Sequence, residues 1–209
     1  MRSSTQRLFA LLAAILTFCV YLPRAAALHA QQLTRGAADS SSRGSGLDLT
    51  IDHWGLGIGN VPHVNGLRLN FRDRGPVLVD GINATIWMPH DTALGVVNGV
   101  AFGLPATGAR SIRGLALGLA GAGADEAIDG VALAPVGVGA GRRLHGIMLA
   151  GIGGGTGGDI AGVGVAGIGF GSGRGLTGVM IGGVGVGTGE DATGIIIGGV
   201  GAGAGGSLR

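Results

Sequence analysis

Three consecutive sixteen-residue segments decide the fold of this chain. They read GVGVAGIGFGSGRGLT from Gly162, GVMIGGVGVGTGEDAT from Gly178 and GIIIGGVGAGAGGSLR from Gly194. The glycine register extends backward at intervals of sixteen through Gly146, Gly130 and Gly114, and less strictly, at spacings of 15, 18 and 15, through Gly99, Gly81 and Gly66. A fixed period of this kind is the signature of a repeat architecture, in which each unit packs on its neighbours.

The apolar residues within a repeat follow the two-residue period of β-strands. With the register glycine as position 1, they occupy positions 2 and 4 (Val179 and Ile181), positions 7 and 9 (Val184 and Val186) and position 15 (Leu176). If every pair faces the interior, the chain changes its buried face between positions 4 and 7, and again between position 15 and the next position 2. Glycine permits the corner or bulge that each change needs.

This pattern predicts an all-β fold. We expect a β-solenoid, similar to a parallel β-helix, with about nine coils of 15–18 residues and a strict sixteen-residue period from Gly114. The alternative is an up-and-down β meander or barrel with one strand per repeat. Glycine at about a third of positions argues against helices, because each glycine in a helix interior costs about 1 kcal/mol relative to alanine.

Charges at positions 12–14 favour the solenoid over the meander. Successive repeats carry charges of alternating sign there: Asp125-Glu126, Arg142-Arg143, Asp159, Arg174 and Glu190-Asp191. In a solenoid these residues stack about 4.8 Å apart, so each has an opposite charge as its neighbour. In a meander, consecutive turns lie at opposite ends, and one rim would be wholly acidic and the other wholly basic.

The first 30 residues have the features of a secretory signal peptide. Arg2 and Arg7 precede an apolar run over residues 8–22, and cleavage is expected after Ala27 or Ala30. The single cysteine, Cys19, lies inside that run, so we expect no cysteine in the mature protein. Residues 31–45 are small and polar and read as a flexible linker.

Composition and charge exclude several functional classes. Of the 209 residues 48 are glycine, but glycine does not recur at every third position as in collagen. All 14 basic residues are arginine, so a phosphate-binding loop that depends on lysine is excluded. Removal of residues 1–27 takes away three arginines and no acids, which leaves 11 arginines against 12 acids and a charge of about −1. We therefore expect no nucleic-acid partner.

Residues 46–98 are expected to form an amino-terminal β segment with degenerate repeats that caps the solenoid, and residues 99–209 the glycine-rich solenoid itself. Repeat proteins need such caps to stay soluble. The repeat ending at Arg209 has no cap of its own. We therefore expect either that the sequence is truncated there, or that the last coil associates end to end with another copy of the chain.

Four groups of residues are candidates for chemistry. Gly154–Asp159 matches the start of a calcium-binding nonapeptide, although the motif occurs once. A metal or acid–base site would draw on residues at positions 52–91, namely Asp52, His53, His63, His90 and Asp91. A column of hydroxyls at position 11 (Thr156, Ser172 and Thr188) would suit a surface-binding array, and Asn83-Ala84-Thr85 is a formal glycosylation acceptor. A structural interpretation is favoured for each, so no catalytic, cofactor-binding or metal residue is assigned and no cofactor is expected.

Two units, Asn98–Leu104 and Arg113–Leu119, resemble the NG-[LIV]-x-[LIV]-G-[LIV] units of secreted, glycine-rich bacterial surface-repeat proteins. The resemblance covers roughly residues 64–209 and implies an exported location. We therefore expect an exported, non-enzymatic repeat protein that acts as a structural or binding element of the bacterial cell envelope or surface, with an unidentified partner there and with membrane association open. The alternatives are an outer-membrane β-barrel-like protein and an enzyme on a β-helix scaffold.

Overall fold

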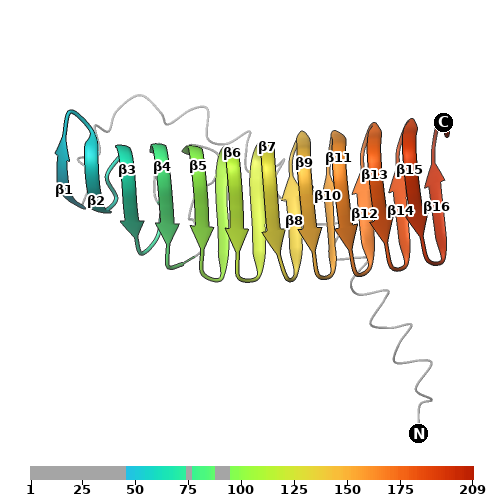
Figure 1. Ribbon diagram of the computed structural model, residues 1–209, viewed down its shortest axis with the longest axis horizontal. Coiled ribbons are helices and arrows are strands. Elements are labelled where there is room, and N and C mark those ends of the chain that lie inside the picture. Colours follow the sequence, from blue (N-terminus) through green and yellow to red (C-terminus); the bar gives the residue numbers. More distant parts are fainter. Residues whose placement is uncertain (1–45, 74–76, 88–94) are drawn as a thin grey trace, which may run out of the picture. The chain divides into compact units, whose positions relative to one another are not determined.

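The sixteen-residue repeats form coils of parallel β-structure that stack on one another (Figure 1). The computed structural model describes residues 46–73, 77–87 and 95–209. These residues form about eight solenoid turns without a helix among them, which confirms the predicted β-solenoid with about one coil fewer than expected. Equivalent strands of successive repeats pair in parallel, with Gly146 beside Gly162 and Gly162 beside Gly178. A meander would pair successive repeats antiparallel.

Each complete coil contributes a long strand to one sheet and a short strand to another. The long-strand sheet contains β1 (Gly46–Ile51), β2 (Trp54–Gly59), β3 (His63–Asn70), β4 (Val77–Thr85), β5 (Gly95–Gly103), β9 (Arg143–Ala150), β11 (Asp159–Ala166), β13 (Leu176–Gly182) and β15 (Ala192–Gly198). The short-strand sheet contains β8 (Gly137–Ala140), β10 (Gly153–Thr156), β12 (Gly169–Ser172), β14 (Gly185–Thr188) and β16 (Gly201–Ala204). Both sheets share β6 (Ala106–Gly118) and β7 (Gly121–Ala134), whose first residues pair in the short-strand sheet and whose last residues pair in the long-strand sheet.

The first two strands depart from the parallel pattern. β1 and β2 form an antiparallel hairpin, and β2 then pairs in parallel with β3. The two residues of the hairpin turn, Asp52 and His53, both have positive φ angles, of 51° and 68°. Two-residue turns of this kind match the twist of the strands that they join.

The register glycines share a backbone conformation that favours glycine. All nine, from Gly66 to Gly194, have φ between 116° and 143°, a region that side-chain-bearing residues rarely adopt. They form a continuous ladder in the long-strand sheet, each paired with the next. The sixteen-residue period therefore follows the backbone conformation and not only the packing.

The interior is a set of one-residue ladders that run from coil to coil. Position 15 supplies the most continuous ladder, in which Ile128, Leu144, Ile160 and Leu176 are at most 1% exposed. Positions 3 and 9 add side chains such as Met148 on the long strand and Phe170 on the short one. Stacking of like positions buries a continuous core that one coil alone would leave open.

The expectation that positions 2 and 4 face the interior is wrong. Ile147 and Leu149 occupy these positions in β9 and are 47% and 43% exposed, whereas Met148 between them is buried. The long strand therefore keeps one alternation from position 15 to position 5, with Leu144, Met148 and Ala150 inward, and needs no change of face at the register glycine. Of the pair at positions 7 and 9 only the second is buried: Ile168 is exposed and Phe170 is not. The corner predicted between positions 4 and 7 is present, since β9 ends at Ala150 and β10 starts at Gly153.

Candidate functional site

The outer surface of the long-strand sheet carries two uninterrupted rows of apolar side chains. Both rows cross eleven paired strands, and every member is exposed or half-buried. Row A consists of Leu49, Leu56, Leu67, Ile82, Val100, Leu115, Val131, Ile147, Val163, Val179 and Ile195. Row B consists of Leu47, Ile58, Leu69, Ala84, Phe102, Leu117, Leu133, Leu149, Val165, Ile181 and Ile197.

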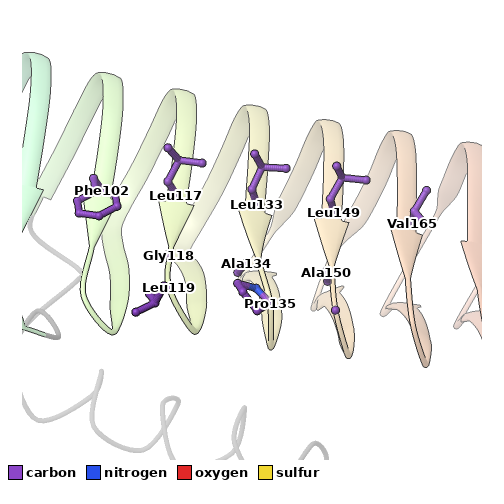
Figure 2. A pocket seen from close by; sticks show the side chains of 11 residues that line it. Phe102, Leu117, Gly118, Leu119, Leu133, Ala134, Pro135, Leu149, Ala150 and Val165 are labelled. Carbon is purple, nitrogen blue, oxygen red and sulfur yellow. The ribbon is translucent and has the colours of Figure 1, made fainter.

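An open groove runs along row B in the middle of the solenoid (Figure 2). Its volume is about 540 Å³, and one of its walls is formed by the row B side chains of five successive coils, from Phe102 to Val165. The other wall comes from the corner that follows, with Leu119, Pro135 and Ala150. The described residues that line the groove are all apolar or glycine, so its chemistry suits hydrocarbon and not a polar substrate.

The corner after row B extends the apolar surface around the edge of the coil. Position 7 presents an exposed aliphatic side chain in successive coils, and we call these residues the corner row: Val136, Ile152, Ile168, Val184 and Val200. In the first coils Phe71 and Trp87 are exposed at about the same place. Apolar side chains thus cover both the second half of the long-strand sheet and its edge.

Charged side chains collect on the opposite edge of the coils. Arg110 donates a hydrogen bond to Glu126 over 3.1 Å, Arg142 lies 3.9 Å from the same carboxylate, and Arg174 donates to Asp159 over 2.9 Å. The hydrogen bond from Arg110 lowers the pKa of Glu126 below its ordinary value. These ion pairs join neighbouring coils, and the predicted stacking of opposite charges is confirmed for Arg142 with Glu126 and for Arg174 with Asp159. All are exposed, and such pairs contribute little to stability.

The outer surface of the short-strand sheet has almost no side chains. Positions 8 and 10 are glycine from β7 to β16, as in Gly121 and Gly123 of β7, while the residues between them point inward. The molecule therefore presents three unlike surfaces: an apolar one, a charged edge and a face of bare backbone.

A buried polar cluster fills the first coils beneath rows A and B. Arg68 is fully buried and forms an ion pair with Asp73. Arg68 also donates hydrogen bonds to the carbonyl oxygen of Val61 at 2.9 Å and to Oδ1 of Asn83 at 2.9 Å. Thr85 donates to the second oxygen of Asp73 at 2.8 Å. In β3 the polar Arg68 and Asn70 therefore lie inside and Leu67 and Leu69 lie outside.

The histidines that we considered as a site are only partly brought together. The rings of His53 and His63 stack with their centres 4.3 Å apart. His90 and Asp91 lie outside the described residues. Within residues 46–73, 77–87 and 95–209 no three histidine, cysteine or acidic side chains gather as a metal site would require.

The remaining candidates have structural roles in the described part of the chain. Asp159 of the calcium-like motif binds Arg174 and accepts a hydrogen bond from the backbone N–H of Gly175 at 3.1 Å. The position 11 hydroxyls point inward, where Ser172 lies 2.6 Å and 2.7 Å from two turn carbonyls. Asn83 is 2% exposed within the Arg68 cluster, so in the folded chain its amide has no room for a glycan.

Neither a family model nor a curated protein nor a solved structure matches the chain. Among the described residues no helix is long and apolar enough to cross a membrane. The candidate site therefore rests on geometry alone, and that geometry singles out rows A and B. Sequence reasoning found these residues but assigned them to the core, because alternation identifies two faces without saying which one is inside.

Proposed function

We propose that this protein is an exported, non-enzymatic element of the bacterial cell envelope or surface, and that it acts by binding a partner through rows A and B. The observation that carries the binding role is the outward direction of both rows on all eleven paired strands. Soluble monomers rarely expose a contiguous apolar patch above about 600 Å², and larger patches mark interaction sites.

The energetics of exposed apolar surface support a covered state. Removing such surface from water contributes roughly 25 cal/mol per Å². A surface loop can hide one leucine, but a flat row that repeats in every coil needs an equally long partner. The charged edge lies on the other side of the coils, so a partner can cover the apolar rows without taking the ion pairs of Arg110 or Arg174 out of water.

Export is supported by the features of residues 1–30. It can be tested with the full chain fused ahead of a phosphatase that becomes active only after it leaves the bacterial cytoplasm. We expect activity from the fusion and its loss in the variant Leu12→Arg/Ile15→Arg, which interrupts the apolar run. Equal activity from both fusions, or activity from neither, would contradict export.

Location at the envelope is tested on the same strains by fractionation and by protease treatment of intact cells. If the protein is an element of the envelope, we expect to find it in the periplasmic or outer-membrane fraction. If it lies at the cell surface, we expect the protease to cleave it on intact cells. The variant Leu133→Thr/Leu149→Thr leaves the signal intact and should be exported as the wild type is. Recovery of the wild type in the cytoplasmic fraction, without cleavage by protease on intact cells, would overturn the proposal.

A further inference from the structure

We propose that rows A and B form an interface between two copies of this chain, packed face to face. This inference rests on the proposed binding role and names the partner. It concerns a surface that the described residues carry on every strand of the long-strand sheet.

The rows have the area that a stable dimer needs. Eleven strands spaced about 4.8 Å apart span about 48 Å. Two rows separated by two residues, with the width of a side chain added, cover about 14 Å along the strands. The product is on the order of 650 Å², close to the roughly 800 Å² per partner of a standard interface. The corner row, from Val136 to Val200, adds further apolar surface at one margin.

The period of the rows is matched by a second copy. Side chains in each row recur at every strand, so a partner packs against them in register only if its own side chains recur with the same spacing. Another solenoid of this chain has that spacing along its whole length. Sheets that pack face to face interdigitate their side chains at about 10 Å separation.

The two rows also complement each other in shape. A two-fold axis along the stack of coils places row A of one copy opposite row B of the other in the same coil. Row B has the larger side chain in three coils, where row A has valine: Val100 would lie opposite Phe102, Val131 opposite Leu133 and Val179 opposite Ile181. In these coils a small residue faces a large one, which helps to fill an apolar interface without voids, and in most of the other coils the two rows carry side chains of similar size.

Charge is favourable for this pairing. Neither row contains a charged side chain in the described strands, so pairing desolvates no ion. The row that flanks row A is polar in its central strands, with Arg113, Asp129 and His145. These residues lie at the rim of the paired surface, where their heads stay in water.

The experiment measures the molar mass of the full chain in solution by light scattering at micromolar concentration. The test variant is Leu133→Arg/Leu149→Glu. The two residues are neighbours in row B, so the introduced charges attract each other within one copy, but a dimer would have to bury them. The matched control is Gly123→Arg/Gly139→Glu, which places the same charges on neighbouring strands of the glycine face, where added β-carbons meet only contacts of 3.6 Å or more.

We expect twice the mass of one chain for the wild type and for the control, and the mass of one chain for the test variant. Circular dichroism checks that all three proteins fold, and Leu133→Thr/Leu149→Thr, which retains strand-forming side chains, replaces the test variant if that one unfolds. Residues 1–45 are present in every protein compared, so their contribution cancels.

Three results would overturn the proposal. They are a wild type with the mass of one chain, a test variant that stays dimeric, and a wild-type monomer that binds phosphatidylcholine vesicles to which the test variant does not bind. The last result would identify lipid as the occupant of the rows. None of these measurements depends on export, so failure of the dimer leaves the proposed function standing and failure of export leaves the dimer standing.

Discussion

The ring of Phe170 fills the space beside Gly154 in the preceding coil. The two residues are partners on neighbouring strands, β12 and β10. A β-carbon on Gly154 would lie 2.9 Å from Cδ1 of that ring and 2.9 Å from the carbonyl oxygen of Val138. Glycine and phenylalanine in the same ladder therefore form one packing unit, in which the small residue leaves room for the large one.

Gly154→Ala is accordingly expected to destabilise the fold by about 1–3 kcal/mol, because overpacking forces the ring and the backbone to shift. Urea unfolding followed by circular dichroism measures the change. Gly171→Ala is the matched control, since no other atom lies within 4 Å of its added β-carbon. If both variants unfold at the same urea concentration, the packing interpretation of Gly154 fails.

Gly146 tests the backbone requirement of the register glycines. Its φ angle is 116°, and a β-carbon there would overlap the carbonyl oxygen of Gly130 on the preceding coil. Strain at such a φ costs about 1–3 kcal/mol before the overlap is counted, so Gly146→Ala is expected to be more damaging than Gly154→Ala. The thermal unfolding midpoint ranks them, with Gly123→Ala, which gains only a 3.8 Å contact, as the variant expected to match the wild type.

Much of this fold could be predicted from sequence because the backbone itself carries the repeat. Gly114 and its successors stand at the only positive-φ position of each coil, so the period appears directly in the letters. The alternating charges at Glu126 and Arg142 also indicate that successive repeats lie next to each other, because like charges in adjacent coils would repel.

The direction of the side chains could not be predicted in the same way. Alternation shows that Ile147 and Met148 lie on opposite faces of the strand. Both are apolar and both would favour the interior, so the sequence does not decide which of the two is buried. Large aliphatic residues stand on both faces of the long strand: Leu144 at position 15 is buried, whereas Ile147 and Leu149 at positions 2 and 4 are exposed, and position 3 between them holds the buried Met148. The polar interior around Arg68 also gives no local signal, since its partner Asp73 lies beyond the strand, in a different segment of the coil.

Ser172 tests the inward role of the position 11 hydroxyls. Its Oγ lies 2.6 Å from the carbonyl oxygen of Gly158 and 2.7 Å from that of Gly175, and it donates to one of them at a time. Ser172→Ala leaves both acceptors without this donor and is expected to cost about 1–3 kcal/mol. Ser172→Thr should retain most of the stability, because Thr156 and Thr188 occupy the same position in the adjacent coils. Equal urea midpoints for the alanine and threonine variants would contradict the role of the hydroxyl.

Asp73 is expected to make the stability of the fold depend on acid. Burial raises the pKa of this carboxyl. The charge of Arg68 and hydrogen bonds from Asn70, Arg68 and Thr85 lower the pKa by more than burial raises it, so it lies below the ordinary value of 3.8. A depressed pKa means that the folded state holds its proton less tightly than the unfolded state. The contribution to stability is therefore complete above about pH 4 and is lost as the pH falls through the pKa of the folded protein.

The variant Asp73→Asn separates this titration from that of the other acids. At neutral pH we expect it to lower the free energy of unfolding by about 3–5 kcal/mol, because it leaves the fully buried Arg68 without its counter-ion. The difference in unfolding free energy between wild type and variant should then shrink as the pH falls below 3.8, since the wild type loses a stabilisation that the variant never had. A difference that stays constant over the acid range would show that Asp73 does not titrate with a lowered pKa.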